Sequence, residues 1–295
     1  MKSRVAVTVI KKQYKFIDER INWYPGHMKK ATEQIENQIG RINLFMEIVD
    51  ARAPISTHNS SLETIIPNKV RKLIVMNKAD LAHKEATQKF LDYYKQKKIH
   101  VIALNAKGEA GGKHLLNELR RLANPHFRSI GSWLMIAGIP NVGKSTIVNS
   151  LRKASKAIVG KTKSAKVGPT PGVTRGLSGF KISLNPLLYL IDTPGIMHKR
   201  IESNEVGYKL LLCSCLKEGI IDNFHLCDYL LYCFNERKMK EYMKLYDVNR
   251  TEDIYEVLGA IQKKYKNKSI NEASDAMLKN FRDGKLGKLT FDDTP

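Results

Sequence analysis

The residues from Gly138 to Ser145 follow the spacing G-x-x-x-x-G-K-[ST], which is the pattern of a loop that binds phosphate groups. The glycines let the backbone curl so that its N–H groups face the phosphates, and the start of the following helix adds a partial positive charge. Lys144 is placed to reach the β- and γ-phosphates of a nucleotide, and Ser145 to ligate Mg²⁺. The residues expected to contact the phosphates are Asn141, Val142, Gly143, Lys144, Ser145 and Thr146.

A second motif, N-K-x-D from Asn77 to Asp80, is suited to recognition of a base. The Asp80 carboxylate can accept hydrogen bonds from N1–H and the exocyclic amine of guanine, and adenine offers no such pair of donors. Asn77 is expected to brace the loop, while the aliphatic stem of Lys78 lies over the purine ring. Further along, Asn105, Ala106 and Lys107 stand where a Ser-Ala-Lys loop would offer a backbone N–H to guanine O6, with Asn105 in place of the serine. The bound nucleotide is therefore expected to be GTP rather than ATP.

The third motif, D-x-x-G from Asp192 to Gly195, is expected near Mg²⁺ and the γ-phosphate. Asp192 would hold a metal-bound water, and the amide of Gly195 would contact the γ-phosphate. A second metal-binding hydroxyl is assigned to Thr174, within the sequence P-G-V-T-R, in preference to the nearby Thr170.

Alternating strands and helices must position these motifs. Strands are predicted over residues 44–49, 72–76, 101–104, 133–139, 177–184 and 187–191. Helices are predicted over about 29–43 and 83–97, from Gly111 to a point before Pro125, and from Ser145 onward. This alternation predicts an α/β domain with a mainly parallel sheet and helices on both faces.

From about residue 204 only helical patterns remain. Apolar stripes with helical spacing are expected to face a core, at Ile254, Val257, Leu258, Ile261 and Tyr265 and at Ile270, Ala273, Met277 and Phe281. We therefore expect a basic extension over residues 1–22, a nucleotide-binding domain over 23–203 and a small all-α C-terminal domain over 204–295.

The charge of the chain points to a polyanionic partner. The 50 Lys and Arg residues outnumber the 29 Asp and Glu residues, which gives a net charge of +21 and favours nucleic acid as the partner. Residues 152–181 carry eight basic and no acidic side chains. No apolar run approaches the length of a transmembrane segment. The four cysteines lack the spacing of a metal site or a disulfide framework, so we interpret them as reduced core residues.

The order of the motifs along the chain is unusual. The guanine-selecting motifs precede the phosphate loop and D-x-x-G comes last, whereas conventional GTPases have the opposite order. A circular permutation keeps the spatial contacts, because domain termini tend to lie close together. With W-Y-P-G-H-M from Trp23 and D-A-R-A-P from Asp50 in the same series, the sequence resembles the circularly permuted GTPases of the YlqF/RbgA and mitochondrial GTPase 1 family. The resemblance covers roughly residues 22–235, and a helical tail of the expected kind follows.

The resemblance implies a P-loop GTPase fold, hydrolysis of GTP with Mg²⁺, contact with rRNA and a role in assembly of the large ribosomal subunit. It also implies K⁺, because Asn141 stands at the position associated with K⁺-dependent GTPases, where an asparagine could equally be a turn residue. Eukaryotic members are mitochondrial and bacterial members cytoplasmic. The basic residues 1–20 favour a mitochondrial location here, with the bacterial cytoplasm as the alternative, and the resemblance further implies peripheral association with the mitochondrial inner membrane.

The group that orients the attacking water is left open by the residues alone. Many GTPases place Gln directly after D-x-x-G, but Ile196 occupies that position here. His27 and His198 compete for the role, and the resemblance favours His27. Two other functions also remain. One is a different RNA-directed GTPase, such as a translation or tRNA-processing factor, and the other is a GTP-dependent RNA-binding scaffold that does not hydrolyse the nucleotide.

Overall fold

The chain falls into two compact units. The computed structural model describes residues 14–17, 28–123, 131–159, 179–193, 195–197, 201–266 and 268–295. The sheet unit comprises the described residues of Tyr24–Arg200 and Asp292–Pro295, and the helical unit comprises those of Met1–Trp23 and Ile201–Phe291.

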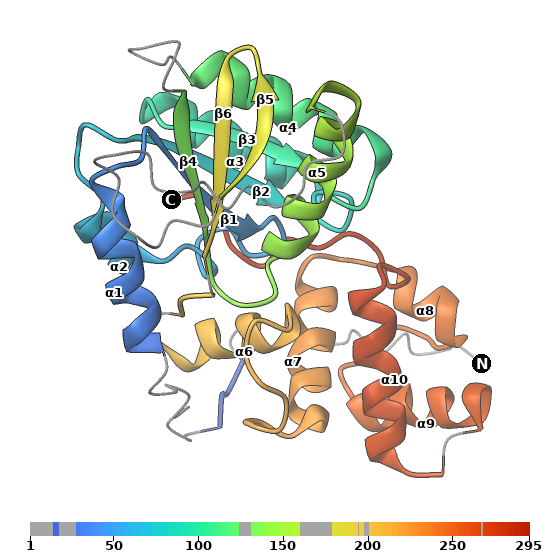
Figure 1. The fold of residues 1–295 in the computed structure, drawn as a ribbon. Coiled ribbons are helices and arrows are strands. Elements are labelled where there is room, and N and C mark those ends of the chain that lie inside the picture. The colour runs from blue at the N-terminus through green and yellow to red at the C-terminus, as the bar shows by residue number, and fades with distance from the viewer. Residues whose placement is uncertain are drawn as a thin grey trace, which may run out of the picture. The chain divides into compact units, whose positions relative to one another are not determined.

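A six-stranded sheet forms the centre of the sheet unit (Figure 1). Its strands are β1 (Leu44–Asp50), β2 (Arg71–Asn77), β3 (His100–Leu104), β4 (Ser132–Ala137), β5 (Gly179–Leu184) and β6 (Leu187–Asp192). They are arranged in the order β3-β2-β1-β4-β6-β5, and all neighbours are parallel except β5 and β6. The prediction of a mainly parallel sheet is confirmed. Because parallel strands end at the same edge, the segments that follow β1, β2, β3, β4 and β6 gather along one edge of the sheet.

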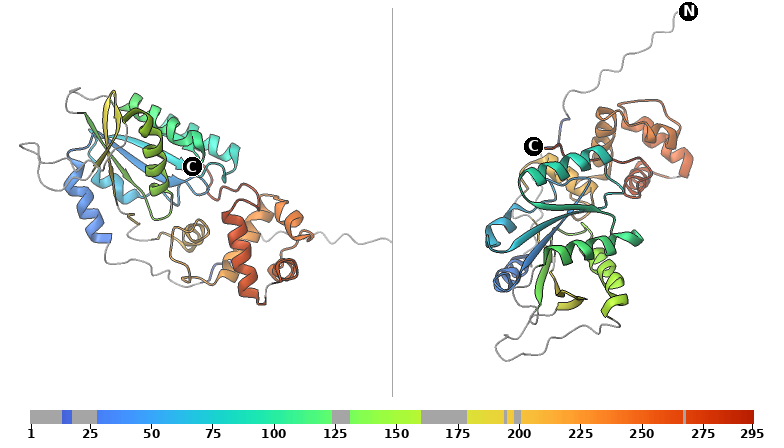
Figure 2. Two further views of the ribbon diagram at one scale, coloured as in Figure 1. Left: turned by 45° about the vertical axis from the view of Figure 1, so that its right-hand side comes forward. Right: turned by 90° about the horizontal axis from the view of Figure 1, so that it is seen from above.

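Helices cover both faces of this sheet, as predicted (Figure 2). They are α1 (Met28–Ile39), α2 (Ser60–Ile65), α3 (Lys84–Gln96), α4 (Glu109–Leu122) and α5 (Lys144–Val159). On one face, apolar side chains of α1 and α2 pack on β1 and β4, and Phe90 and Tyr94 of α3 pack on β1 and β2. On the other face α4 and α5 lie against each other so closely that a Cβ on Gly112 would come within 2.4 Å of the Ser150 hydroxyl.

The helical unit contains α6 (Asn204–Leu212), α7 (Asn223–Glu236), α8 (Glu241–Tyr246), α9 (Ile254–Tyr265) and α10 (Ile270–Arg282). Most of the two predicted apolar stripes are buried, and all four cysteines are buried thiols that form no disulfide. Tyr265 and Ile270 are the corrections, because they are 42% and 37% exposed. Both stand at helix ends, where one side of the residue has no following or preceding turn to pack against.

Residues far from the helices in sequence complete the helical unit. Tyr14 is buried against Tyr208 and Tyr229, and its hydroxyl donates to the Asp228 carboxylate at 3.1 Å. The domain boundaries expected at residues 22 and 203 stay a prediction. In the structure, residues 14–17 pack within the helical unit, and 292–295 pack within the sheet unit.

The return of the chain to the sheet unit is fixed by a buried carboxylate. Asp292 accepts hydrogen bonds from the amides of Ile55 and Ser56, both at 2.8 Å, and from the Ser56 hydroxyl at 2.7 Å. The segment it contacts follows β1 directly, so the last described residues stabilise a turn at the carboxyl edge of the sheet.

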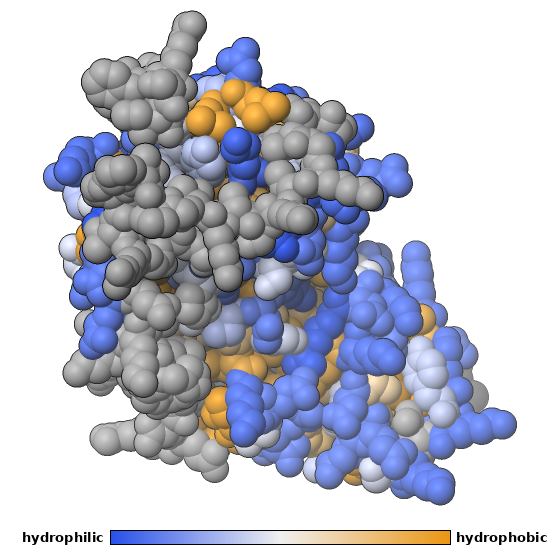
Figure 3. All heavy atoms as spheres, viewed as in Figure 1, coloured by the Kyte–Doolittle hydropathy of each residue, from blue (hydrophilic) through white to orange (hydrophobic). Residues whose placement is uncertain are grey.

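The surface visible in Figure 3 is mainly hydrophilic, with apolar residues between the polar ones. Among the described helices, none combines the length and the apolar character that crossing a bilayer requires.

Candidate nucleotide-binding site

The loop from Gly138 to Gly143 joins β4 to α5, and this is the strand–loop–helix context that the phosphate-binding pattern predicts. Gly143 has a φ of 101°, and a Cβ at this position would lie 2.2 Å from the side-chain nitrogen of Asn77. Only glycine fits both the backbone conformation and the approach of Asn77. Asn141 also has a positive φ, of 60°, so the loop turns sharply before α5 begins at Lys144.

Lys144 and Gly195 bring the phosphate loop and the D-x-x-G loop together. The Lys144 side chain is buried, and its amine donates to the Ile139 carbonyl at 2.8 Å. A Cβ on Gly195 would lie 3.1 Å from that amine and 3.2 Å from the Pro140 nitrogen, so the third motif ends directly beside the first. Two backbone loops and one amine therefore lie next to one another.

Asp192 ends β6, next to the phosphate-loop strand. It is paired in register with Ile136 of β4, and the Thr193 hydroxyl donates to the Ile136 carbonyl at 2.7 Å. Burial raises the pKa of Asp192, while the charges of Lys144 and Arg152 partly oppose that shift. The hydroxyl of Ser145 and the carboxylate of Asp192 are both oxygen donors, which are the ligands that Mg²⁺ prefers. The donor set therefore fits a magnesium ion.

The side chain of Asn77 connects three loops through hydrogen bonds. Its side-chain nitrogen donates to the Val142 carbonyl at 2.9 Å, and its side-chain oxygen accepts from the Ala106 amide at 3.1 Å. The N-K-x-D loop is thereby held to the phosphate loop on one side and to the Asn105–Lys107 loop on the other. Asp80 is exposed at this edge of the sheet.

The hydrogen bonds of Asn105 explain why asparagine can replace the expected serine in this loop. Its side-chain oxygen accepts from the amides of Lys107, at 2.9 Å, and Gly108, at 3.3 Å. A serine hydroxyl could accept the same bonds, and both residue types are common in such turns. The substitution therefore keeps the acceptor that shapes the loop.

Sequence reasoning assigned no role to a buried cluster of charges at the end of β1. Asp50 forms a bidentate ion pair with Arg52, with distances of 2.9 and 2.8 Å, and a second ion pair with the Lys78 amine at 2.8 Å. The signal available in the sequence was a carboxylate at the end of a mostly apolar strand, followed two residues later by Arg.

Several of the residues assigned from the sequence lie outside the described part of the chain. They are His27, Thr174, Thr170 and His198, together with most of the basic stretch 152–181. Ile196 is described and buried, with 3% of its surface exposed. In the described ranges no group of three or more His, Cys, Asp and Glu side chains is arranged to hold a metal ion.

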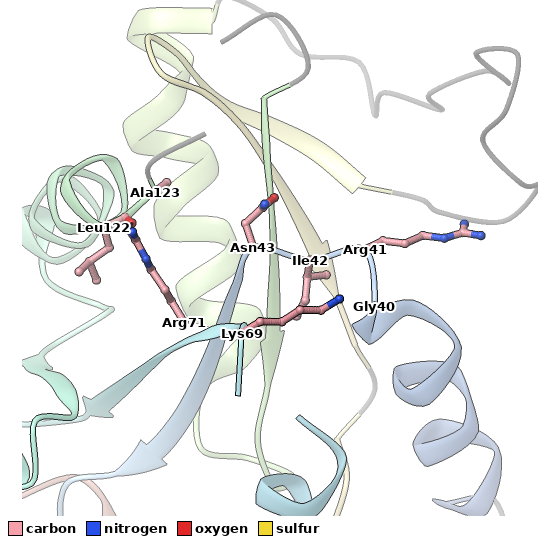
Figure 4. A pocket seen from close by; sticks show the side chains of 8 residues that line it. All are labelled: Gly40, Arg41, Ile42, Asn43, Lys69, Arg71, Leu122 and Ala123. Carbon is pink, nitrogen blue, oxygen red and sulfur yellow. Dashed lines mark hydrogen bonds between the residues drawn. The ribbon is translucent and has the colours of Figure 1, made fainter. Parts of the chain in front are cut away.

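A cavity of about 290 Å³ lies at the amino edge of the sheet, opposite these loops (Figure 4). Its lining includes Arg41, Lys69 and Arg71 and has no acidic residue. Arg71 points to the Leu122 carbonyl, to which it donates a hydrogen bond, whereas Lys69 and Arg41 extend the other way. Since none of the three nucleotide motifs lines it, this cavity is separate from the candidate site.

The mainly parallel sheet, with a phosphate loop after β4 and a guanine loop after β2, defines a P-loop GTPase, and the order of the motifs defines a circularly permuted one. A family described as "50S ribosome-binding GTPase" matches residues 134–270. Ribosome biogenesis GTPase A of Priestia megaterium is 35% identical over 92% of this chain and 96% of its own length. Mitochondrial ribosome-associated GTPase 1 of Xenopus tropicalis is 30% identical over 96% of this chain and 98% of its own.

A solved structure agrees with these relatives. The GNP-bound YlqF from T. maritima has a TM-score of 0.62 and 25% identity, covering 90% of this chain and 98% of that one. The chain therefore belongs to the family of GTPases that includes ribosome biogenesis GTPase A and the mitochondrial ribosome-associated GTPase 1.

Proposed function

We propose that this chain binds GTP with Mg²⁺, hydrolyses it and acts in assembly of the large ribosomal subunit. The observation that carries the proposal is the position of Asn77, which holds the guanine loop against both the phosphate loop and the Asn105–Lys107 loop. The ribosomal role is supported by the names of the relatives, and contact with rRNA is supported by the net charge of +21.

In this site, the amides of residues 141–146 and the Lys144 amine would contact the phosphates, and the Gly195 amide would contact the γ-phosphate. Asp80 reads guanine, the stem of Lys78 lies along the base, and the Ala106–Lys107 backbone faces O6. Ser145, Asp192 and Thr174 would hold Mg²⁺, which when bound neutralises charge on the β- and γ-phosphates.

Ile196 has no polar group with which to orient the attacking water. Of the two candidate histidines, His27 and His198, we assign that role to His27 because the family resemblance favours it. We also propose that Asn141 is a ligand of K⁺, which would bind beside the phosphate loop. Mitochondrial relatives support a mitochondrial location, and bacterial relatives support the cytoplasm as the alternative. Peripheral association with the inner membrane is proposed from the family resemblance alone.

The deciding experiment measures multiple-turnover GTP hydrolysis by the full chain with and without large ribosomal subunits, together with co-sedimentation on those subunits. We expect stimulation by the subunits and tighter co-sedimentation with a non-hydrolysable GTP analogue than with GDP at matched salt. Affinity should fall steeply as salt rises, because phosphate contacts release counterions. Absence of turnover would favour a non-hydrolysing scaffold, and failure to co-sediment would favour another RNA-directed GTPase.

The catalytic assignment is tested by two variants in the same assay. His27→Ala should lower subunit-stimulated hydrolysis by about 10²-fold or more with little change in GTP affinity. His198→Ala, the matched control, should lower it less, and the opposite ranking would transfer the role to His198.

A further inference from the structure

Asp50 is a buried carboxylate whose side-chain partners are Arg52, from its own segment, and Lys78, from the N-K-x-D loop. It ends β1, and none of its surface is exposed. The Arg52 guanidinium donates two hydrogen bonds to one side of the Asp50 carboxylate, and the Arg52 amide donates to the same carboxylate at 3.0 Å. The other side faces the Lys78 amine at 2.8 Å.

Lys78 carries this contact on to the phosphate loop. Its amine also donates to the Asn141 carbonyl at 2.8 Å, so a single nitrogen joins the end of β1 to the loop after β4. Both residues have left-handed backbone conformations, with φ of 59° at Lys78 and 60° at Asn141, which non-glycine residues seldom adopt. Asp50 ends β1, Lys78 directly follows β2 and Asn141 lies in the loop after β4, so the contact joins the carboxyl ends of three neighbouring strands.

The charge at this point is fixed by its neighbours. Burial alone would raise the pKa of Asp50, but the Arg52 and Lys78 cations outweigh it and hold the pKa well below its usual range. Without that negative charge, the Arg52 and Lys78 cations would face each other with no counter-ion between them, and the Lys78 amine would lose the group that directs it.

We propose that Asp50 is a positioning residue for the guanine nucleotide: its carboxylate, with Arg52 closing one side, directs the Lys78 amine to the Asn141 carbonyl. This contact sets the spacing between the loop that reads the base and the loop that holds the phosphates. The inference rests on GTP binding at the site proposed above, and it extends the nucleotide-binding machinery to the D-A-R-A-P segment.

The chain offers a matched control on the same strand. Glu47 is also a buried carboxylate of β1, 5% exposed, but its contacts are to the Asn59 amide and to His58. Asp50→Asn should weaken GDP binding and raise KM for GTP about tenfold with kcat unchanged, whereas Glu47→Gln should change both by less than about twofold. Calorimetric titration with GDP and steady-state hydrolysis by the full chain supply the two readouts.

A double-mutant cycle separates positioning from general destabilisation. Lys78→Met alone should also weaken GDP binding, and in that background Asp50→Asn should cause little further loss, since both changes break the same contact. If Asp50→Asn fails to fold, the double variant Asp50→Asn with Arg52→Met also removes the Arg52 guanidinium that has lost its carboxylate partner. This double variant should still raise KM for GTP. Unchanged GDP affinity in a folded Asp50 variant, or losses that simply add, would overturn the proposal. Failure of the unmodified chain to bind GDP would instead refute the GTP site itself.

Discussion

The contacts that stabilise the sheet unit internally differ in kind from those that stabilise the helical unit internally. Between the loops of the sheet unit, polar side chains reach backbone groups far away in sequence, as Asn77 does with Val142 and Asp292 with Ser56. In the helical unit most helices begin with a local side-chain cap, at Ser203, Asp222, Asp253 and Ser269, and pack through apolar stripes. Polar substitutions in the first should therefore change ligand binding, and apolar truncations in the second should change stability.

The largest expected effect is on the core of the helical unit. Phe281 is 2% exposed and packs against Phe291, with ring centroids 5.7 Å apart. Phe281→Ala should lower the free energy of unfolding of this unit by about 3–5 kcal/mol, because it leaves a cavity. Urea unfolding measures the loss, and GTP affinity should stay within about twofold. Phe281→Leu is the control with a smaller cavity, and a parallel loss of GTP affinity would show that the two units are not separable in this way.

The next effect concerns base selection in the sheet unit. Asp80→Asn should weaken GTP binding by about 2–3 kcal/mol, because two hydrogen bonds to a charged acceptor are lost. The variant should favour xanthosine triphosphate, whose carbonyl in place of the exocyclic amine suits an Asn amide. Competition binding with both nucleotides measures the change, and the melting temperature should not move because Asp80 is exposed. A variant that still preferred GTP would exclude Asp80 as the base reader.

A smaller effect is expected at Asp292, where the chain returns from the helical unit to the sheet unit. Asp292→Asn should lower the free energy of unfolding of the sheet unit by about 1–2 kcal/mol, because one amide oxygen replaces a carboxylate that accepts three hydrogen bonds. Hydrogen exchange at the Ile55 and Ser56 amides should become faster. The exposed neighbour gives the control, since Asp293→Asn should change stability by less than about 0.5 kcal/mol. Equal effects of the two variants would contradict a specific role of Asp292.

The smallest effect depends on pH. Burial by itself lowers the pKa of His58, but the hydrogen bond and charge of Glu47, with the charge of Glu63, outweigh it and raise the pKa above 6.5. The protonated form is therefore stabilised by folding, and this contribution is complete below the unfolded pKa and lost as pH rises through the folded one. His58→Gln should remove a decline of up to about 1 kcal/mol in stability across this range. Urea unfolding at several pH values tests it, with His114→Gln, on the exposed surface of α4, as the control that should keep the decline.

The motif-bearing elements could be predicted from sequence because each motif needs a particular local context. The boundary of β4 was less accurate: the apolar run to Ile139 predicted a strand two residues longer, but Ile139 is buried as part of the loop. The Asp50–Lys78 contact could not be predicted, because it depends on the pairing of β1 with β2 and on the left-handed conformation of Lys78. Tyr14 and Asp292 were missed for a related reason, since their partners lie more than 200 residues away.

The position of Asp292 in the chain has a consequence for biosynthesis. Ser56 and Asp292 are 236 residues apart, and every residue of the helical segment 201–291 leaves the ribosome before Asp292 does. Until then the two backbone amides and the hydroxyl that contact Asp292 in the turn after β1 lack this acceptor, so burying them would carry the cost of unpaired donors. A nascent chain therefore acquires the last acceptor of its sheet unit only when the sequence of the other unit is complete. Arrest of synthesis before this point would leave the Ile55 and Ser56 amides without the Asp292 carboxylate.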